Sequence, residues 1–281
     1  MKNKFALISV FFGTEPFWMP AFVLSCRYNT DIDWLFFTNL PKPEFCPNNL
    51  KYFHFSLDDF NRLSSNKLLL KVNISSNYTY KICDFRPAFG EIFEDYLVEY
   101  DFWGHCDIDV VWGDIKKYLT QIEMDKYDIV TSRVGRISGH FCLFRNESSV
   151  NSSYHWIPGI RKMLTDRKHY AIDEGCMTNY LQANRNPTIL LKLKHAIFGK
   201  QKMVPNVFWE KNWTTSGAHQ RLMGDDPCRY WWWKNGCTFD SDSNEVMYLH
   251  FHNIKKFMSQ INFEHGDNPE KFFISKNGIF C

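Results

Sequence analysis

Residues 102–115 read FWGHCDIDVVWGDI and place two carboxylates, Asp107 and Asp109, directly after an apolar run. The run over 101–106 has the character of a buried β-strand. Side chains alternate along an extended chain, so the two carboxylates point to the same side. At the carboxyl end of a parallel strand, such side chains face the ligand crevice. Neighbouring carboxylates repel each other unless a cation joins them, and their oxygen atoms suit a divalent metal ion.

The two aspartates also have a plainer interpretation, in which one caps a helix or pairs with a lysine in an ordinary turn. A calcium-binding loop is excluded, because its third ligand position falls on Val111 and Gly113 comes one place late. The apolar strand before the pair favours a metal site over an ordinary turn. The ion that we expect there is Mn²⁺ or Mg²⁺.

The chain before this segment alternates strands with helices. Apolar runs predict strands over 4–12, 31–39 and 50–56, and helical spacing predicts helices over 16–29 and 56–72. This alternation predicts an α/β fold with a mostly parallel central sheet that helices flank on both faces.

The rest of the chain is more irregular. Local patterns predict helices over 83–97, from Asp114 and over 172–182, and strands over 127–132, 139–146, 229–239 and 245–253. We expect a single domain over 1–281. Its Rossmann-like nucleotide-donor half spans 1–120, and its acceptor half, 121–281, ends in a segment that binds the metal and a diphosphate.

Composition bounds the function classes. With 44% hydrophobic and 23% charged residues the chain is globular, and a net charge of +2 gives no support for nucleic-acid binding. The nine cysteines form no Cys-x-x-Cys pair, which argues against zinc and fits free thiols in a reducing compartment. No apolar stretch approaches 18 residues, and MKNKFALISVFF at the start fits a strand better than a signal peptide. We therefore expect a cytoplasmic protein.

A second group of polar residues lies in EVMYLHFHNIKKF, residues 245–257. His250 follows a predicted strand, and a neutral imidazole is a good third ligand for Mn²⁺. Lys255 and Lys256 come soon after, and lysines hold phosphate oxygens as point charges. A metal ion and a lysine together neutralise the charge that a departing diphosphate gains. The plainer interpretation is a half-buried histidine and two solvated lysines.

These features together resemble the nucleotide-sugar glycosyltransferases of the GT-A fold, and in particular bacterial enzymes of capsule and O-antigen synthesis. The resemblance rests on the alternation of strands and helices, on HCDIDVVWG and on LHFHNIKKF. Some GT-A enzymes carry a late His-Phe-x-Gly-x-x-Lys motif, and His250, Phe251 and Lys256 match its spacing. Asn253 replaces the glycine, which leaves the conformation of this loop open. The resemblance covers most of residues 5–256.

The resemblance implies roles for several residues. Asp109 binds the metal directly, Asp107 serves the metal or the sugar or ribose of the donor, and His250 completes the metal shell. KICDFR matches a donor-binding element, although a helix-start carboxylate beside an arginine explains it equally well. The donor contacts implied in this way are Phe11, Gly13, Thr14, Thr38, Asp84, Arg86, Gly139 and His140, together with Lys255 and Lys256 on the diphosphate.

The acceptor side is defined by YAIDEGCM, which contains Asp173 and Glu174. In GT-A enzymes an acid pair in this region lies near the acceptor, and one carboxylate takes the proton of its hydroxyl. The alternative is that acids simply favour a helix N-terminus. The sequence leaves inversion and retention both open. The stretch LLKLKHAIFGKQK mixes apolar and basic residues and is a candidate for peripheral contact with a membrane surface.

The sequence therefore predicts a metal-dependent glycosyltransferase of polysaccharide biosynthesis, which moves a sugar from a nucleoside diphosphate, with UDP as the first candidate, to a hydroxyl. The acceptor is a glycan or a lipid-linked glycan at the inner face of the cell membrane. One alternative is a metal-dependent nucleotidyltransferase or phosphohydrolase, which usually needs more carboxylates to hold two metal ions. Another is a glycan-binding module that has lost activity.

Overall fold

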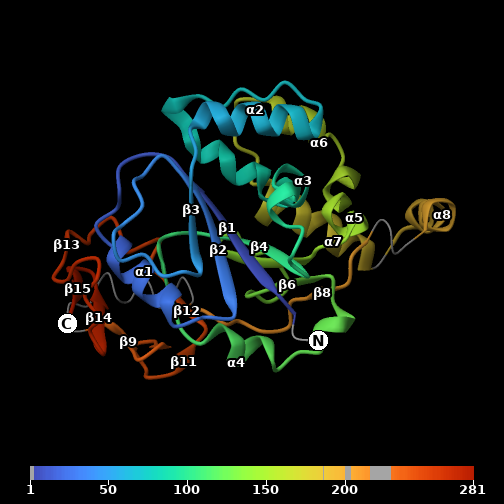
Figure 1. Cartoon of the computed structure of the whole chain (residues 1–281). Helices are drawn as coiled ribbons and strands as arrows, with labels where there is room; N and C mark the ends of the chain where they lie inside the picture. Colours follow the sequence, from blue (N-terminus) through green and yellow to red (C-terminus); the bar gives the residue numbers. More distant parts are fainter. Residues whose placement is uncertain (1–2, 186, 200–203, 216–228) are drawn as a thin grey trace.

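The computed structural model describes residues 3–185, 187–199, 204–215 and 229–281 (Figure 1). Its central sheet has the strand order β3-β2-β1-β4-β7-β6-β8. Neighbouring strands run parallel from β3 to β4, β7 is antiparallel to both of its neighbours, and β8 is parallel to β6. The predicted α/β class with a mostly parallel sheet is confirmed. The strands are β1 (Phe5–Phe11), β2 (Ile32–Thr38), β3 (Leu50–His54), β4 (Phe102–Cys106), β6 (Ile129–Thr131), β7 (Phe141–Arg145) and β8 (Val207–Phe208).

The central strands are apolar because both faces of the sheet are covered. On β1, Ala6 and Ile8 point into one hydrophobic cluster and Leu7 points into the other. This division follows the two-residue period of an extended chain. Helices α2 (Leu57–Leu68), α3 (Phe89–Ile92), α6 (Ile160–Thr165) and α7 (Thr178–Arg185) pack on the first cluster, and α1 (Met19–Arg27) and α4 (Ile115–Leu119) on the second (Figure 1).

Two predicted helices differ in detail from the prediction. The segment 83–97 is a 3₁₀-helix, η1 (Ser76–Ala88), then α3 and a second short 3₁₀-helix, η2 (Glu94–Tyr96). Pro87 lies inside this segment, and a proline removes a backbone donor and disrupts a continuous α-helix. The helix expected over 172–182 exists, but its first six residues form a π-helix, η5 (Ile172–Met177). The remaining short helices are η3 (Met124–Lys126), α5 (Ser148–Asn151), η4 (Ser153–Trp156) and α8 (Ile189–Phe198).

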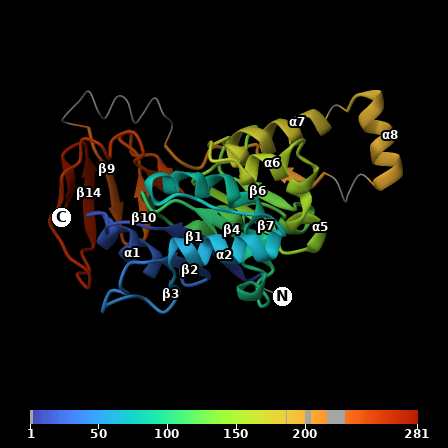
Figure 2. The same ribbon diagram turned by 90° about the horizontal axis from the view of Figure 1, so that it is seen from above.

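The C-terminal segment forms a second sheet, of strand order β11-β10-β9-β14-β15-β13. Its buried side chains, among them Trp231 and Trp233, pack against α1. Figures 1 and 2 place this sheet at one end of the molecule and α8 at the other. The strands are β9 (Trp231–Lys234), β10 (Cys237–Phe239), β11 (Glu245–Val246), β13 (Gln260–Ile261), β14 (Lys271–Ser275) and β15 (Gly278–Phe280).

A separate two-stranded ladder joins the segment after β4 of the central sheet to the C-terminal segment. Strand β5 (Val110–Trp112) pairs with β12 (Tyr248–His250) in antiparallel fashion, and His250 lies opposite Val110. The backbone N–H of Phe251 also donates to the carbonyl of Asp109 over 3.2 Å. The ladder therefore carries the late histidine to the acidic turn that follows β4. Across the described ranges, we find no helix with both the length and the apolarity needed to span a bilayer.

Candidate functional site

The strand order defines one crevice at the carboxyl ends of the parallel strands. The chain builds β1, β2 and β3 outward in one direction and then returns to place β4 on the other side of β1. Such a reversal leaves a crevice outside the carboxyl ends of the two strands, where α/β proteins bind ligands. A cavity of about 430 Å³ lies at this point. Phe11 at the end of β1 lines it, together with Asp107 and Asp109 after β4.

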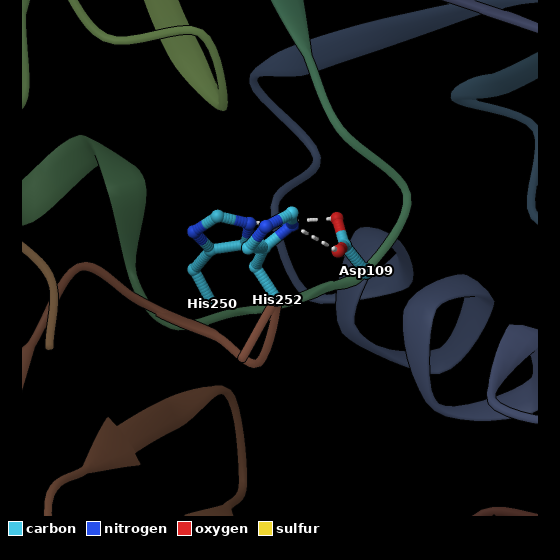
Figure 3. A group of neighbouring side chains, drawn as sticks. All are labelled: Asp109, His250 and His252. Atoms are coloured by element: carbon cyan, nitrogen blue, oxygen red, sulfur yellow. Dashed lines mark ion pairs between the residues drawn. The ribbon is translucent and has the colours of Figure 1, made fainter. Parts of the chain in front are cut away.

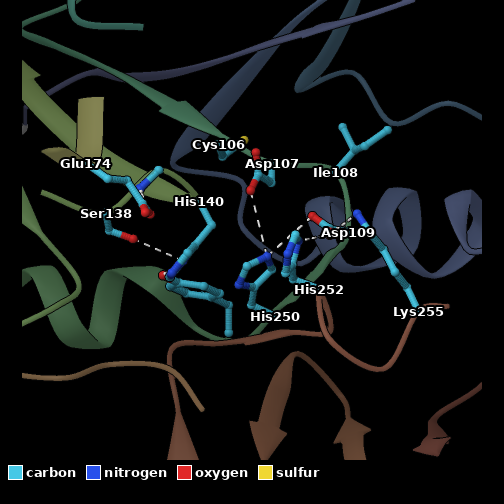
Figure 4. Close-up of polar contacts among 12 residues, drawn as sticks. Cys106, Asp107, Ile108, Asp109, Ser138, His140, Glu174, His250, His252 and Lys255 are labelled. Carbon is cyan, nitrogen blue, oxygen red and sulfur yellow. Dashed lines mark hydrogen bonds and ion pairs between the residues drawn. The ribbon is translucent and has the colours of Figure 1, made fainter. Parts of the chain in front are cut away.

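The acidic turn meets two histidines in this cavity (Figures 3 and 4). The Nε2 atom of His250 lies 3.5 Å from Asp109 Oδ1 and 3.7 Å from Asp107 Oδ2, and His252 Nδ1 lies 3.9 Å from Asp109 Oδ2. One ligand atom each from Asp109, His250 and His252 falls within a 4.8 Å group. These three residues form a candidate metal centre.

The donor chemistry of this group fits a divalent ion. His250 Nε2 is buried and has no hydrogen-bond partner among the described residues, although it faces two carboxylates. A buried nitrogen in this state needs a partner, and a metal ion supplies one. A mixed set of carboxylate oxygens and imidazole nitrogens suits Mn²⁺, and Mg²⁺ prefers the oxygens alone.

Two cationic side chains of the protein share the acidic turn with the histidines. Lys255 Nζ lies 2.8 Å from Asp109 Oδ2, and the guanidinium of Arg86 contacts Asp107 and lies 2.9 Å from Asp173 Oδ2. Both cations line the same cavity. The acidic turn is therefore paired inside the crevice and not on a distant surface.

The surroundings shift the pKa values of the two aspartates in opposite directions. Burial alone would raise the pKa of Asp109, but the nearby charge of His250, together with the charge and the hydrogen bond of Lys255, lowers it well below its usual value. Burial raises the pKa of Asp107, and the charge of Asp109 adds to this effect while Arg86 opposes it. Asp109 is therefore a firmly ionised carboxylate, as a metal ligand must be.

The acid pair of η5 lies across the cavity from this turn. Glu174 accepts a hydrogen bond from the backbone N–H of Gly139 over 2.8 Å and forms an ion pair with Arg136. Asp173 is almost fully buried, and this burial raises its pKa although Arg86 opposes the shift. Arg86 connects Asp173 to Asp107, so the acid pair and the acidic turn belong to one network.

Gly139 and His140 lie between these groups. A Cβ atom on Gly139 would come within 2.8 Å of Arg86 Nη1 and 3.0 Å of Glu174 Oε1, so a side chain at this position would have to displace these groups. The ring of His140 packs on that of His250, with centroids 4.2 Å apart, and its Nδ1 contacts Ser138 Oγ at 3.1 Å. Burial lowers the pKa of His140, and the resulting neutral ring supports His250 from behind.

Five of the predicted site residues do not line this cavity. Gly13 donates its N–H to Asn39 in the turn after β1, and Thr14 beside it is exposed. Thr38 is buried and its hydroxyl accepts from the N–H of Leu40. The other two are Asp84 and Lys256.

Asp84 and Lys256 lie in different surroundings. Asp84 is fully buried, pairs with Lys81 at 2.8 Å and accepts hydrogen bonds from the N–H groups of Tyr170 and Ile172. Asp84 thus fastens the segment that leads to Asp173. The ammonium of exposed Lys256 lies over the ring of Phe257, so the lysine at the acidic turn is Lys255.

The cavity also contains residues that the sequence reasoning did not select. His252 is the main one. It lies two residues after His250, as Asp109 lies two residues after Asp107, so the same argument from alternating side chains could have identified it. Tyr80, Cys83 and His169 also line the cavity, and the rings of Tyr80 and His169 meet edge to face. No local pattern distinguishes these three.

Comparison with solved structures gives distant matches. Mouse xyloside xylosyltransferase 1, in its apo form, matches at 12% identity and a TM-score of 0.46, over 89% of this chain and 98% of that one. The glycosyltransferase GlyE of Streptococcus pneumoniae TIGR4 matches at 11% identity and 0.33, over 74% of this chain and 54% of its own. The bifunctional glycosyltransferase WbbM matches at 10% identity and 0.34, over 76% and 48%. These similarities are too low to support conclusions about this chain.

Comparison of sequences gives a family. No curated protein matches the chain. The model of one protein family, described as a family of unknown function, DUF6625, matches residues 7–281. This match includes the acidic turn, the late histidines and the whole second sheet. The chain therefore belongs to the DUF6625 family.

Proposed function

We propose that this protein is a metal-dependent glycosyltransferase that moves a sugar from a nucleoside diphosphate to a hydroxyl of a glycan. One observation carries the proposal. The Asp109, His250 and His252 group lies beside Asp107 and Lys255, in the crevice where the order of the parallel strands reverses. A single cation site next to a lysine suits a leaving diphosphate, because negative charge accumulates there as the sugar departs.

We assign Asp107, Asp109 and His250 to the metal, and we add His252. A bound Mn²⁺ or Mg²⁺ supplies positive charge to the diphosphate at this place. Lys255 is held by Asp109 in the free protein, and its flexible ammonium is within reach of a phosphate once the carboxylate has another partner. We assign Lys255 to the phosphate oxygens, because it lines the cavity, whereas the ammonium of Lys256 lies over the ring of Phe257.

The acid pair is assigned to the acceptor side. A carboxylate that takes a proton works best with a pKa raised toward neutrality, and Asp173 has the raised pKa. The ion pair with Arg86 orients this carboxylate toward the cavity. Glu174 is held by the Gly139 N–H and by Arg136, which makes it the orienting member of the pair. Of the donor contacts that the sequence predicts, we keep Phe11, Arg86, Gly139 and His140, which line the cavity.

The donor, the acceptor and the compartment belong to the same proposal. We take UDP-sugars as the first donors to test and a glycan or lipid-linked glycan of a surface polysaccharide as the acceptor. The eight cysteines among the described residues are free thiols, which fits the reducing cytoplasm at the inner face of the cell membrane.

The test measures slow hydrolysis of a panel of nucleotide sugars with Mn²⁺ and with EDTA. We expect one donor to be hydrolysed, and EDTA and Asp109→Asn each to reduce the rate by roughly 100-fold or more, because both remove charge stabilisation from the leaving group. Asp125→Asn is the matched control, since it makes the same change at an exposed site remote from the cavity. Cleavage of phosphoesters or free nucleotides in place of nucleotide sugars would show a phosphohydrolase instead.

A further inference from the structure

Helix α8 carries its apolar side chains on the outside. Most surface helices turn an apolar stripe toward the core. Here Ile189, Leu190, Leu193 and Ile197 are 57–79% exposed. At about 100° per residue, these four side chains fall within an arc of roughly 100° on the helix surface. The exposed residues thus form one continuous apolar face.

The opposite face of α8 attaches the helix to the body of the protein. His195 is the buried side chain of this helix, and it lies about 190° from the middle of the apolar arc. Its Nε2 atom contacts the side-chain oxygen of Asn184 at 2.8 Å, and the ring of Phe198 packs on Trp156 with centroids 5.4 Å apart. These contacts place the apolar face on the side of α8 that is turned away from its packing partners. Figures 1 and 2 show α8 itself at one end of the molecule.

Basic residues flank this face and acidic residues are missing around it. Lys192 and Lys194 lie on either side of the apolar arc, each about 90–110° from its middle. The sequence from 175 to 209 contains Arg185, Lys192, Lys194, Lys200 and Lys202 and no Asp or Glu. An apolar stripe between lysines is the pattern of a helix that lies in the interface of an anionic bilayer, with apolar side chains among the acyl chains and ammonium groups at the phosphates.

We propose that α8 is the element by which this protein binds a membrane surface that contains anionic lipid. The charge pattern favours lipid over a second copy of the chain, because a symmetric contact between two such faces would bring lysines toward lysines. The proposal does not depend on sugar transfer. It bears on that function, because α8 comes after α7 in the chain, and α7 begins directly after η5, the element that carries the acid pair.

The test is flotation of the protein with phosphatidylcholine vesicles that contain or lack phosphatidylglycerol. We expect binding to be at least roughly tenfold stronger with the anionic lipid, from the charge of the lysines near the surface. Leu193→Gln with Ile197→Gln should abolish binding to both kinds of vesicle. Lys192→Glu with Lys194→Glu should remove only the preference for anionic lipid.

Matched controls change the same residue types elsewhere. Val98→Gln replaces an equally exposed apolar side chain, and Lys42→Glu with Lys71→Glu makes the same change in net charge. Both control proteins should bind like the original. If the Leu193 and Ile197 variant floats normally, the proposal is wrong. The proposal is also wrong if neither the original protein nor this variant binds vesicles, and the original protein sediments as a dimer that the variant converts to a monomer.

Discussion

At the scale of single residues, Gly139 marks the most crowded point of the site. The guanidinium of Arg86, from η1, and the carboxylates of Asp173 and Glu174, from η5, lie within 3.1 Å of the position that a Cβ atom would take here. The two groups that would come closest, from Arg86 and Glu174, are the ends of long side chains, so they yield to an added atom more easily than backbone does. A methyl group at position 139 should therefore reduce the rate of donor hydrolysis more than it reduces the stability of the fold.

We predict that Gly139→Ala lowers donor hydrolysis by roughly tenfold, because Arg86 must give up part of its contact with Asp173 or Asp107. The free energy of unfolding should fall by only about 1 kcal/mol. Gly175→Ala is the control, since its added Cβ would meet neighbours at an ordinary 3.7 Å or more. Donor hydrolysis and urea unfolding measure the two effects. Equal losses in both variants would contradict the geometry described for Gly139.

Among the elements, α2 has a start that the sequence specifies fully. Ser56 accepts a hydrogen bond from the N–H of Asp59, and the Asp59 carboxylate accepts from the N–H and the hydroxyl of Ser56. This reciprocal capping satisfies two backbone donors that would otherwise lack partners. The hydroxyl and the N–H of Ser56 lower the pKa of Asp59.

The lowered pKa has a consequence for stability. A carboxyl group whose pKa is lower in the folded state stabilises it above the unfolded pKa, about 3.9, and this contribution is lost as pH falls through the folded pKa. We predict that Asp59→Ala lowers the unfolding free energy at pH 7 by about 0.5–1 kcal/mol. The difference should shrink as the pH falls below about 3.9. Urea unfolding at several pH values measures it.

The control for this prediction is Asp58→Ala, which removes an acid from the same first turn of α2. Its loss should be the smaller of the two at pH 7. A deficit for Asp59→Ala that stays constant from pH 7 to pH 3 would show that the ionised carboxylate does not cap the helix.

Elements also show where sequence reasoning succeeds. The strands β1, β2 and β4 and the capped start of α4 at Asp114 follow from local patterns of apolar and capping residues, and they appear as expected. The helix expected over 83–97 was wrong in type, because Pro87 competes with an otherwise helical pattern. Of the second sheet, the sequence predicted only strands over 229–239 and 245–253. The other strands are short and depend on pairing with one another, which no local pattern reveals.

Over the whole molecule, the site depends on long-range contacts that no local pattern contains. The sequence predicted Asp107, Asp109 and His250 as one group, and the structure brings them together. The motif spacing favoured Lys256, whereas Lys255 is the lysine that contacts Asp109, because the outcome depends on how the turn after β12 folds. The bridge that Arg86 makes between Asp107 and Asp173 joins three distant segments, and His169 reaches the cavity in the same way.

Because the metal group draws on distant segments, an ion should stabilise the entire fold. We predict that Mn²⁺ at 100 times its dissociation constant raises the unfolding free energy by about 2.7 kcal/mol, since the unfolded chain has no such site. Scanning calorimetry with and without Mn²⁺ measures the rise in melting temperature. The rise should vanish in His250→Ala and persist in the Asp125→Asn control. An undiminished rise in His250→Ala would place the ion elsewhere.

The ladder of β5 and β12 has a consequence for the way the protein is made. Asp109 and Lys255 are 146 positions apart, so a ribosome must add a further 146 residues after Asp109 before the crevice acquires this ammonium group. Until then the nascent chain presents β5, an apolar strand whose partner has not been synthesised. Premature termination before residue 248 would leave β5 without its partner strand, so that it could pair with other chains and aggregate. Such fragments would need chaperones or degradation.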